Sequence, residues 1–249
     1  MASKQTFLPV LLAFLFWGAS CSQLVKEDRR DCPCYLRINL SGLRKYPVYL
    51  SVTGAGTYKV ERDTVLQLPV SRKGVDIQAV SGMQPGADGR IRIPYGSACP
   101  ELYIYHEHLR ADSDTARVTV QLHKQFCTLR LHFDGPEGWG EPYGAGVRGR
   151  VEGLYTDGLP FAGDFRCSLD DSYTVRIPRQ APEEELWMDV TMPDRILRSF
   201  ALGSYMLKAG YDWNATDLRD LDLDIHLSIS ELRLSSGSWS AAIPLTVDI

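Results

Sequence analysis

The sequence lacks the short motifs that mark several common enzyme classes. Its 249 residues contain neither a Gly-Xaa-Ser-Xaa-Gly nucleophile elbow nor a glycine-rich phosphate-binding loop. It also lacks an excess of positive charge, because 27 lysines and arginines stand against 31 aspartates and glutamates. The overall charge therefore gives no electrostatic reason to expect nucleic acid or an anionic membrane face as a partner.

Histidine is scarce, with five residues in the chain. His106 and His108 lie two positions apart, so on a strand they share one face, which is the geometry of a metal pair. Glu107 points the other way and completes the set only if the strand twists or bulges. We favour the simpler interpretation, in which both histidines are polar residues on a solvated face. We predict no catalytic residue, no metal ion, no cofactor and no small-molecule substrate, and therefore no enzymatic activity.

A long apolar segment is missing as well. The apolar run over residues 7–17 is shorter than the ~20 residues that span a bilayer. Lys4 precedes this run and small residues follow it up to Cys21, which is the layout of a secretion signal over residues 1–20. Cys21 is placed like the lipid-bearing cysteine of bacterial lipoproteins, although Gly18 stands where that pattern usually has leucine. We predict lipidation of Cys21, and the alternative is an ordinary cleaved signal peptide.

The six cysteines are few for an exported chain. Export permits disulfides, but the sequence leaves their pairing open. Cys32-Pro33-Cys34 has one residue between its cysteines, whereas zinc motifs usually have two or more. We therefore favour structural or free thiols over a metal site. Lipidation of Cys21 leaves an odd number of cysteines, namely Cys32, Cys34, Cys99, Cys127 and Cys167.

The sequence is rich in period-two alternation of apolar and polar residues. Leu36, Ile38 and Leu40 alternate with polar neighbours, and the longest run of this kind extends over residues 221–229. Short strands separated by glycine- and proline-rich turns, with almost no helical period, predict antiparallel β-sandwiches. Residues 197–207 predict a strand pair or one bent strand. Residues 214–218 predict a single helical turn capped by Thr216.

The chain divides into segments without a flexible linker. We predict a lipidated tether over residues 21–34, a first β-sandwich domain over 35–124 and a second over 125–249. The boundary lies near Lys124-Gln125, where a new alternating run begins. No internal repeat is visible at the level of the sequence.

Three stretches carry a resemblance to a known family. Residues 26–34 are a charged segment that leads into Cys-Pro-Cys, residues 177–180 read Ile-Pro-Arg-Gln, and residues 210–214 read Gly-Tyr-Asp-Trp-Asn. The third stretch continues through Asp217 into the alternating strand. In this order behind Cys21, the stretches resemble the FimB-type fimbrial anchor lipoproteins of Bacteroidales, a family of transthyretin-like fimbrial subunits.

The resemblance implies both a fold and a function. It implies two tandem transthyretin-like antiparallel β-sandwich domains behind a cleaved signal peptide. It also implies a surface-exposed outer-membrane lipoprotein that anchors a fimbrium at its base and limits its length. The expected partners are fimbrial shaft subunits, bound through an exposed strand edge, and the outer membrane, bound through the lipid.

A surface glycan-binding or adhesin lipoprotein is the alternative function. We expect Trp139 to be the best candidate for an exposed ring, and we expect Trp187 and Trp239 to pack between sheets. The aromatic residues that could form a glycan platform are Tyr103, Tyr105, Tyr143, Tyr155, Trp139 and Trp213.

Two threonines are candidates for modification. Asp63-Thr64-Val65 and Asp114-Thr115-Ala116 are similar to the O-glycosylation triplet of exported Bacteroidota proteins. Thr64 and Thr115 are therefore candidate O-glycosylation sites, and such short patterns also arise by chance.

Overall fold

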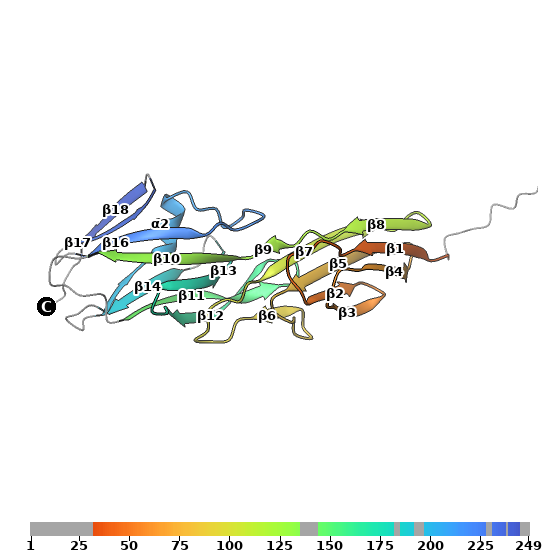
Figure 1. Cartoon of the computed structure of the whole chain (residues 1–249), viewed down its shortest axis with the longest axis horizontal. Helices are drawn as coiled ribbons and strands as arrows, with labels where there is room; N and C mark the ends of the chain where they lie inside the picture. The colour runs from red at the N-terminus through yellow and green to blue at the C-terminus, as the bar shows by residue number, and fades with distance from the viewer. Residues whose placement is uncertain are drawn as a thin grey trace, which may run out of the picture. The chain divides into compact units, whose positions relative to one another are not determined.

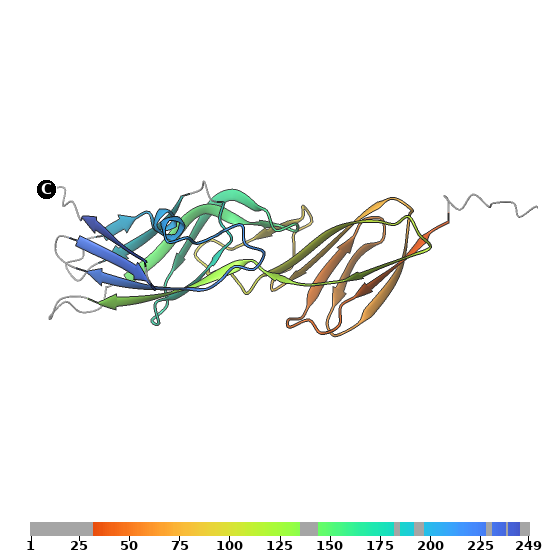
Figure 2. The same ribbon diagram turned by 90° about the horizontal axis from the view of Figure 1, so that it is seen from above.

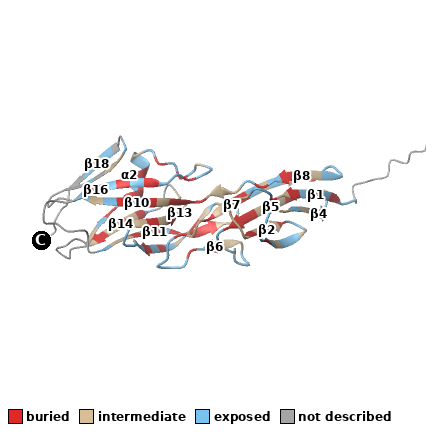
Figure 3. Cartoon of the chain, in the orientation of Figure 1, coloured by how far each residue is buried: buried red, intermediate tan, exposed pale blue. Residues whose placement is uncertain are grey.

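The computed structural model describes residues 32–134, 144–181, 185–191, 197–227, 231–237 and 239–244. Within these ranges the regular secondary structure is almost entirely strand, with one short helix (Figure 1). Figure 3 shows buried and exposed residues alternating along many strands, as the sequence periodicity predicts. The prediction of an all-β fold is confirmed, and most of the strand pairs are antiparallel. No helix in the described ranges is both long and apolar enough to cross a membrane.

The first half of the chain forms two sheets that enclose one core. A three-stranded sheet has the order β4-β1-β8, and a second sheet has the order β3-β2-β5-β7-β9. The strands are β1 (Cys34–Asn39), β2 (Val48–Val52), β3 (Gly56–Val60), β4 (Val65–Val70), β5 (Gly74–Ser81), β7 (Tyr103–Arg110), β8 (Thr115–Thr119) and β9 (His123–Lys124).

The second half also forms two sheets. Their orders are β13-β10-β16-β17-β18 and β12-β11-β14-β15, and β6 (Arg90–Arg92) joins the latter by pairing with β11. The strands are β10 (Phe126–Asp134), β11 (Gly144–Tyr155), β12 (Pro160–Ser168), β13 (Thr174–Pro178), β14 (Leu186–Thr191), β15 (Leu197–Phe200), β16 (Leu221–Leu227), β17 (Glu231–Ser236) and β18 (Trp239–Pro244).

The two halves share one strand topology. The order β4-β1-β8 corresponds to β13-β10-β16, and the order β3-β2-β5-β7 corresponds to β12-β11-β14-β15. In both halves one strand pair is parallel, β1 with β8 and β10 with β16. The structure therefore contains a repeat of seven strands that the sequence does not display. The second half departs from this plan by one added hairpin, β17–β18.

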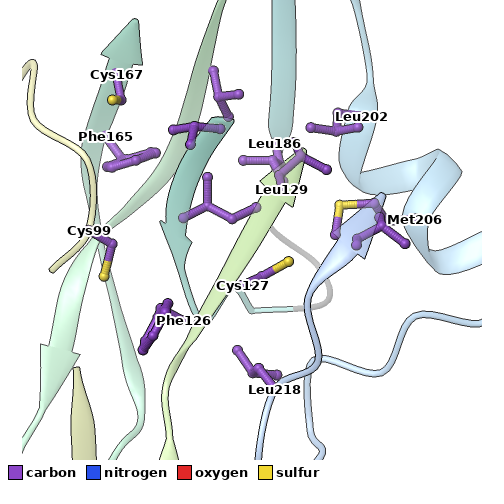
Figure 4. Packing of buried hydrophobic residues seen from close by; sticks show 14 of the residues in the cluster. Cys99, Phe126, Cys127, Leu129, Phe165, Cys167, Leu186, Leu202, Met206 and Leu218 are labelled. Carbon is purple, nitrogen blue, oxygen red and sulfur yellow. The ribbon is translucent and has the colours of Figure 1, made fainter. Parts of the chain in front are cut away.

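Two clusters of buried side chains fill the sandwiches. Leu36 and Ile77 belong to the first cluster, and Leu129 belongs to the second. In Figure 4, Leu129 and Cys127 on β10 lie beside side chains from β14 and from the helix. Packing does not follow chain order, because Ile91 belongs to the second cluster through the pairing of β6 with β11. The domain bounds 35–124 and 125–249 stay a prediction.

The expectation for residues 197–207 is only half right. A strand, β15, is present, but it is followed by helix α2 (Leu202–Lys208), which Figure 2 shows nearly end-on. Leu202, Gly203 and Met206 are the buried residues of α2. Their spacing places them on one face of a helix, and the short apolar run did not distinguish that face from a strand.

Candidate functional site

Two of the stretches that resemble the fimbrial anchor family meet in space around Arg179. This guanidinium donates hydrogen bonds to the backbone carbonyls of Trp213, Ala215 and Thr216. It also donates to Gln125 Oε1 over 2.7 Å. One half-buried side chain therefore ties the end of β13 to the segment before β16 and to the start of β10.

Asp217 and Asp220 complete this arrangement, which we call the Arg179 clamp. Asp217 accepts hydrogen bonds from the backbone N–H of Lys124 and from His123. Asp220 accepts from the Lys124 ammonium group and from the backbone N–H of Thr128, over 2.6 and 2.7 Å. The predicted helical turn over residues 214–218 is wrong, because these residues form turns and bends. The Asp217 carboxylate pairs with a distant strand instead of with a helix terminus.

The aromatic residues of the third stretch are interior residues. Tyr211 and Trp213 are buried, with ring centroids 4.6 Å apart. The Tyr211 hydroxyl donates to the carbonyl of Arg219 over 2.7 Å, and burial raises the pKa of this hydroxyl. The clamp is therefore a structural element, and it does not leave these rings free to bind a ligand.

Two of the six aromatic residues considered for a glycan platform lie in the interior. Tyr105 and Trp213 are buried, while Trp139 and Tyr143 lie outside the described residues. Trp187 does not pack between sheets as expected, since it lies on the outer face of β14 with the Arg148 guanidinium 5.2 Å from its ring centroid. Trp239 lies in β18.

A different polar groove was not anticipated from the sequence. It encloses about 530 Å³ on the outer face of the sheet formed by β3, β2 and β5, beside the loop over residues 84–89. Tyr49, Ser51 and Gln78 line it, and Thr156 donates to Gln78 over 2.8 Å. A volume in this range suits a small ligand. Tyr49 alternates with the buried Val48 and Leu50, so its outward position is readable from the sequence, whereas the loop that walls the groove is distant in the chain.

The two paired histidines flank an acidic residue. His108 Nδ1 lies 2.7 Å from Asp76, and His106 Nε2 lies 3.9 Å from the same carboxylate. The predicted shared face is thus confirmed, and each imidazole is partly exposed. No group of three or more metal-ligating side chains is found in the described ranges.

Four cysteines are free thiols inside the protein, namely Cys34, Cys99, Cys127 and Cys167. Burial raises the pKa of Cys99 and of Cys167, and it raises the pKa of Cys127 to about 11. Cys32 is exposed at the beginning of the described chain. The four buried thiols fill core positions and hold no disulfide.

The predicted modification sites differ in their surroundings. Cys21 lies outside the described residues. Thr64 is half-buried, and its carbonyl accepts a hydrogen bond from the backbone N–H of Leu40. Thr115 is exposed at the start of β8, and Asp114 beside it pairs with Arg72. Both threonines therefore stay candidates, and Thr115 is the more accessible of the two.

The free strand edges are the features that suit a protein partner. A sheet edge presents unpaired backbone groups, and natural proteins protect such edges with charged residues or proline. Among the described strands with one ladder partner, charged residues or histidine occur in β3, β6, β8, β9, β12, β13 and β15, and β4 contains Pro69. β18 has the sequence Trp-Ser-Ala-Ala-Ile-Pro, with no charge and with proline only at its end. β18 is therefore the least protected edge in the described chain.

Comparison by sequence gives no match for this chain among protein-family models or curated proteins. Solved structures do share its fold. A candidate polysaccharide-binding protein (DUF1812) from Bacteroides thetaiotaomicron matches with a TM-score of 0.61 and 12% identity, over 84% of this chain and 98% of that chain.

Two further structures belong to the same group. A candidate adhesin from Bacteroides ovatus matches with a TM-score of 0.59 and 10% identity, over 85% of this chain and 95% of that chain. The fimbrial anchor protein Mfa2 from Porphyromonas gingivalis matches with a TM-score of 0.56 and 12% identity, over 84% and 99%. The structural neighbours are thus fimbrial and adhesin-like proteins of Bacteroidales, which confirms the fold that the resemblance implied. Identities this low establish the fold alone.

Proposed function

We propose that this protein is an outer-membrane lipoprotein that roots a fimbrium at the cell surface and limits its length. Acyl chains on Cys21 hold it in the membrane, and a shaft subunit binds the free edge of β18. The unprotected edge of β18 is the observation that carries the proposal. The fold shared with Mfa2, a fimbrial anchor protein, supports it, and so does the order of the three stretches behind Cys21.

Lipidation supplies an attachment that resists the pull of a filament. Each buried methylene contributes about 0.8 kcal/mol, and a second acyl chain converts marginal binding into stable anchoring. Metabolic labelling with a fatty-acid probe tests this step, comparing the native chain with Cys21→Ala. If the variant still incorporates the fatty-acid label, Cys21 is not the lipidated residue.

Strand addition supplies the contact with the shaft. An extended segment of a partner that pairs with β18 gains a ladder of backbone hydrogen bonds. Ser240, Ala241 and Ala242 are small residues that permit the close approach of another backbone. β17 and β18 also lie beyond the seven-strand plan that the two halves share, so the hairpin is not needed to complete the second sandwich.

A lysine on the edge strand tests this contact. Ala242 is exposed, so Ala242→Lys adds the kind of charge that protects other edges. We expect cells with this variant to shed fimbriae and to carry longer ones, while the protein stays folded and acylated. The matched control is Ala162→Lys, which places the same side chain at an exposed position on β12, an edge that already contains Asp164 and Arg166. Normal attachment in Ala242→Lys contradicts the proposed edge.

Deletion of the gene tests the role as a whole. Loss of an anchor releases fimbriae into the medium and alters their length, whereas loss of an unrelated adhesin leaves both unchanged. Intact-mass measurement of the exported protein shows in the same strain whether Thr64 or Thr115 carries a glycan.

Glycan binding is the second candidate, and the groove beside Tyr49 favours it. An aromatic ring next to neutral hydroxyl and amide groups matches the alternating apolar and polar faces of a sugar. Tyr49→Ala should abolish binding to any glycan that the wild type retains on an array. Tyr95→Ala, which removes an exposed ring outside the groove, is the control.

A further inference from the structure

The outer face of the sheet β4-β1-β8 carries positive charge and no negative charge. Side chains on this face alternate with the buried positions of each strand. Three strands with three outward positions each contribute Tyr35, Arg37, Asn39, Val65, Gln67, Pro69, Thr115, Arg117 and Thr119. Two of these residues are arginines, and none is acidic.

The two arginines stand directly opposite each other. In the parallel pairing of β1 with β8, Arg37 is in register with Arg117. Both side chains are exposed, and neither guanidinium group has a hydrogen-bond or ion-pair partner among the described residues. Like charges opposite each other in a sheet are unfavourable to folding. A pair of uncompensated guanidinium groups in this position therefore fits a ligand that brings negative charge.

The charge of the surrounding chain has the same sign. Residues 35–124 contain 12 lysines and arginines and 8 aspartates and glutamates, a net charge of +4. Residues 125–249 contain 11 and 20, a net charge of −9. The negative total of the whole chain hides this separation. The positive half is the one that follows Cys21 in the sequence.

The chain length between Cys21 and this face is short. Cys34 follows Cys21 by thirteen positions, and a fully extended chain of that length spans at most about 45 Å. An acylated Cys21 would hold β1 within this distance of the headgroups, so even a weak contact is formed at high effective concentration. Tyr35 is 47% exposed and Val65 43% exposed on the same face. Tyrosine beside arginine is a combination that suits the membrane interface, where rings lie at headgroup level and guanidinium groups bind phosphate.

We propose that the outer face of the sheet β4-β1-β8 binds the phosphate groups of the membrane to which the protein is tethered. Arg37 and Arg117 together bind these anionic groups, while Tyr35 contacts the headgroup layer. This contact rests on the proposed lipid anchor for its proximity to the membrane. It adds a second attachment that orients the positive half toward the bilayer and leaves the negative half, with β18, available to the shaft.

Vesicle binding by a chain without acyl groups tests the face alone. The probe is the mature chain from residue 21 with Cys21→Ser, mixed at low salt with vesicles of equal parts phosphatidylcholine and phosphatidylglycerol. We expect co-sedimentation with these vesicles, none with pure phosphatidylcholine, and loss of binding at high salt. Arg37→Gln combined with Arg117→Gln should weaken the partition about 30-fold, since each arginine near an anionic surface adds about fivefold.

A matched double variant controls for net charge. Arg62→Gln combined with Arg110→Gln removes two exposed arginines of the same half outside this face, and its binding should stay close to that of the parent. The thermal midpoint of the Arg37/Arg117 double variant should equal or exceed that of the parent, because the like-charge contact is gone. Equal weakening in both double variants, a lower midpoint, or no preference for anionic vesicles overturns the proposal.

The outcome is separable from the fate of the anchor. If the protein carries no fatty acid on cells but its unacylated form binds anionic vesicles, the lipid anchor is refuted and the proposal for the face stands. If the protein is acylated on cells but its unacylated form does not bind anionic vesicles, the anchor stands and the proposal for the face is refuted.

Discussion

Single side chains with several partners hold distant segments together in this protein. Arg179 is the clearest case, since its donors reach three carbonyls before β16 and the Gln125 amide. These carbonyls lie in an irregular segment that has no ladder of its own. A buried carbonyl without a donor loses free energy comparable to a hydrogen bond, so the guanidinium contributes to the local order of the segment together with Asp217 and Asp220.

Arg179→Met should destabilise the protein by about 2–4 kcal/mol, because it removes the donors and leaves the partly buried carbonyls of Trp213 and Ala215 unpaired. Urea unfolding followed by tryptophan fluorescence measures this change. Arg179→Lys should recover less than half of the loss, because a single ammonium group does not reproduce the planar fork of a guanidinium. The exposed Arg166→Gln serves as the control and should change stability by less than about 0.5 kcal/mol. A similarly small effect of Arg179→Met contradicts the clamp.

The surroundings of Tyr46 lead us to expect that the protein loses stability at high pH. Its hydroxyl lies 2.6 Å from the Leu40 carbonyl oxygen and 2.7 Å from Asp63 Oδ1. Burial and the Asp63 carboxylate raise the pKa of Tyr46 to about 12, whereas the unfolded chain has a value near 10. The folded state thus keeps a proton that the unfolded state loses. The contribution is complete below about pH 10 and disappears as pH rises toward about 12.

The variant Tyr46→Phe isolates this contribution. Its denaturation midpoint should fall less steeply than that of the wild type in the same alkaline range. The pKa values of Tyr105 and Tyr211 are raised as well, so the variant retains part of the decline. If the midpoints of the two proteins fall equally steeply with pH, the proposed contribution of Tyr46 is contradicted.

At the scale of elements, α2 shows how a short segment is fixed by close packing. Gly203 faces β14, and a Cβ added there would lie 3.0 Å from the Leu186 Cβ. The helix has no side-chain cap at its N-terminus. Seven residues are also too few for a stable isolated helix. Contact with β14 is therefore the main source of its stability.

Gly203→Val should displace α2 from β14 and destabilise the protein by about 1–3 kcal/mol through overpacking. Ser204 is exposed on the same helix, so Ser204→Val is a control with a comparable new side chain. Thermal unfolding measures both. The expectation is overturned when the two variants have the same midpoint.

The whole molecule has two hydrophobic cores that chain order does not cleanly separate. Ile91 lies in the first half of the sequence and packs into the second core. β7 contributes Ile104 to the second core and Tyr105 to the first. The cores are therefore linked through β7, and the second core depends on residues that precede the predicted boundary.

Ile91→Ala should lower the free energy of the unfolding transition that tryptophan fluorescence reports by about 2–5 kcal/mol. Trp187 and Trp213, which report this transition, lie in the second half of the chain. Leu36→Ala removes a fully buried side chain from the first core, and it should move the fluorescence transition less than Ile91→Ala does. A larger shift in Leu36→Ala indicates that the two cores unfold as one.

The sequence by itself determined the fold class and the inner faces of the strands. Side chains alternate strictly along a strand, so the burial of Leu36, Ile38 and Leu40 follows from a window of a few residues. The layout around Cys21 and the three family-like stretches likewise needed no structure. The exposed pair His106 and His108 was also readable from spacing alone.

Tertiary structure alone decided which strands meet. The parallel pairings of β1 with β8 and of β10 with β16 join segments far apart in the chain, and alternation carries no information about the partner. The same limit explains the Arg179 clamp, the groove beside Tyr49 and the opposition of Arg37 to Arg117. Each depends on contacts between segments that lie far apart in the chain, and a window of a few residues carries no information about such contacts.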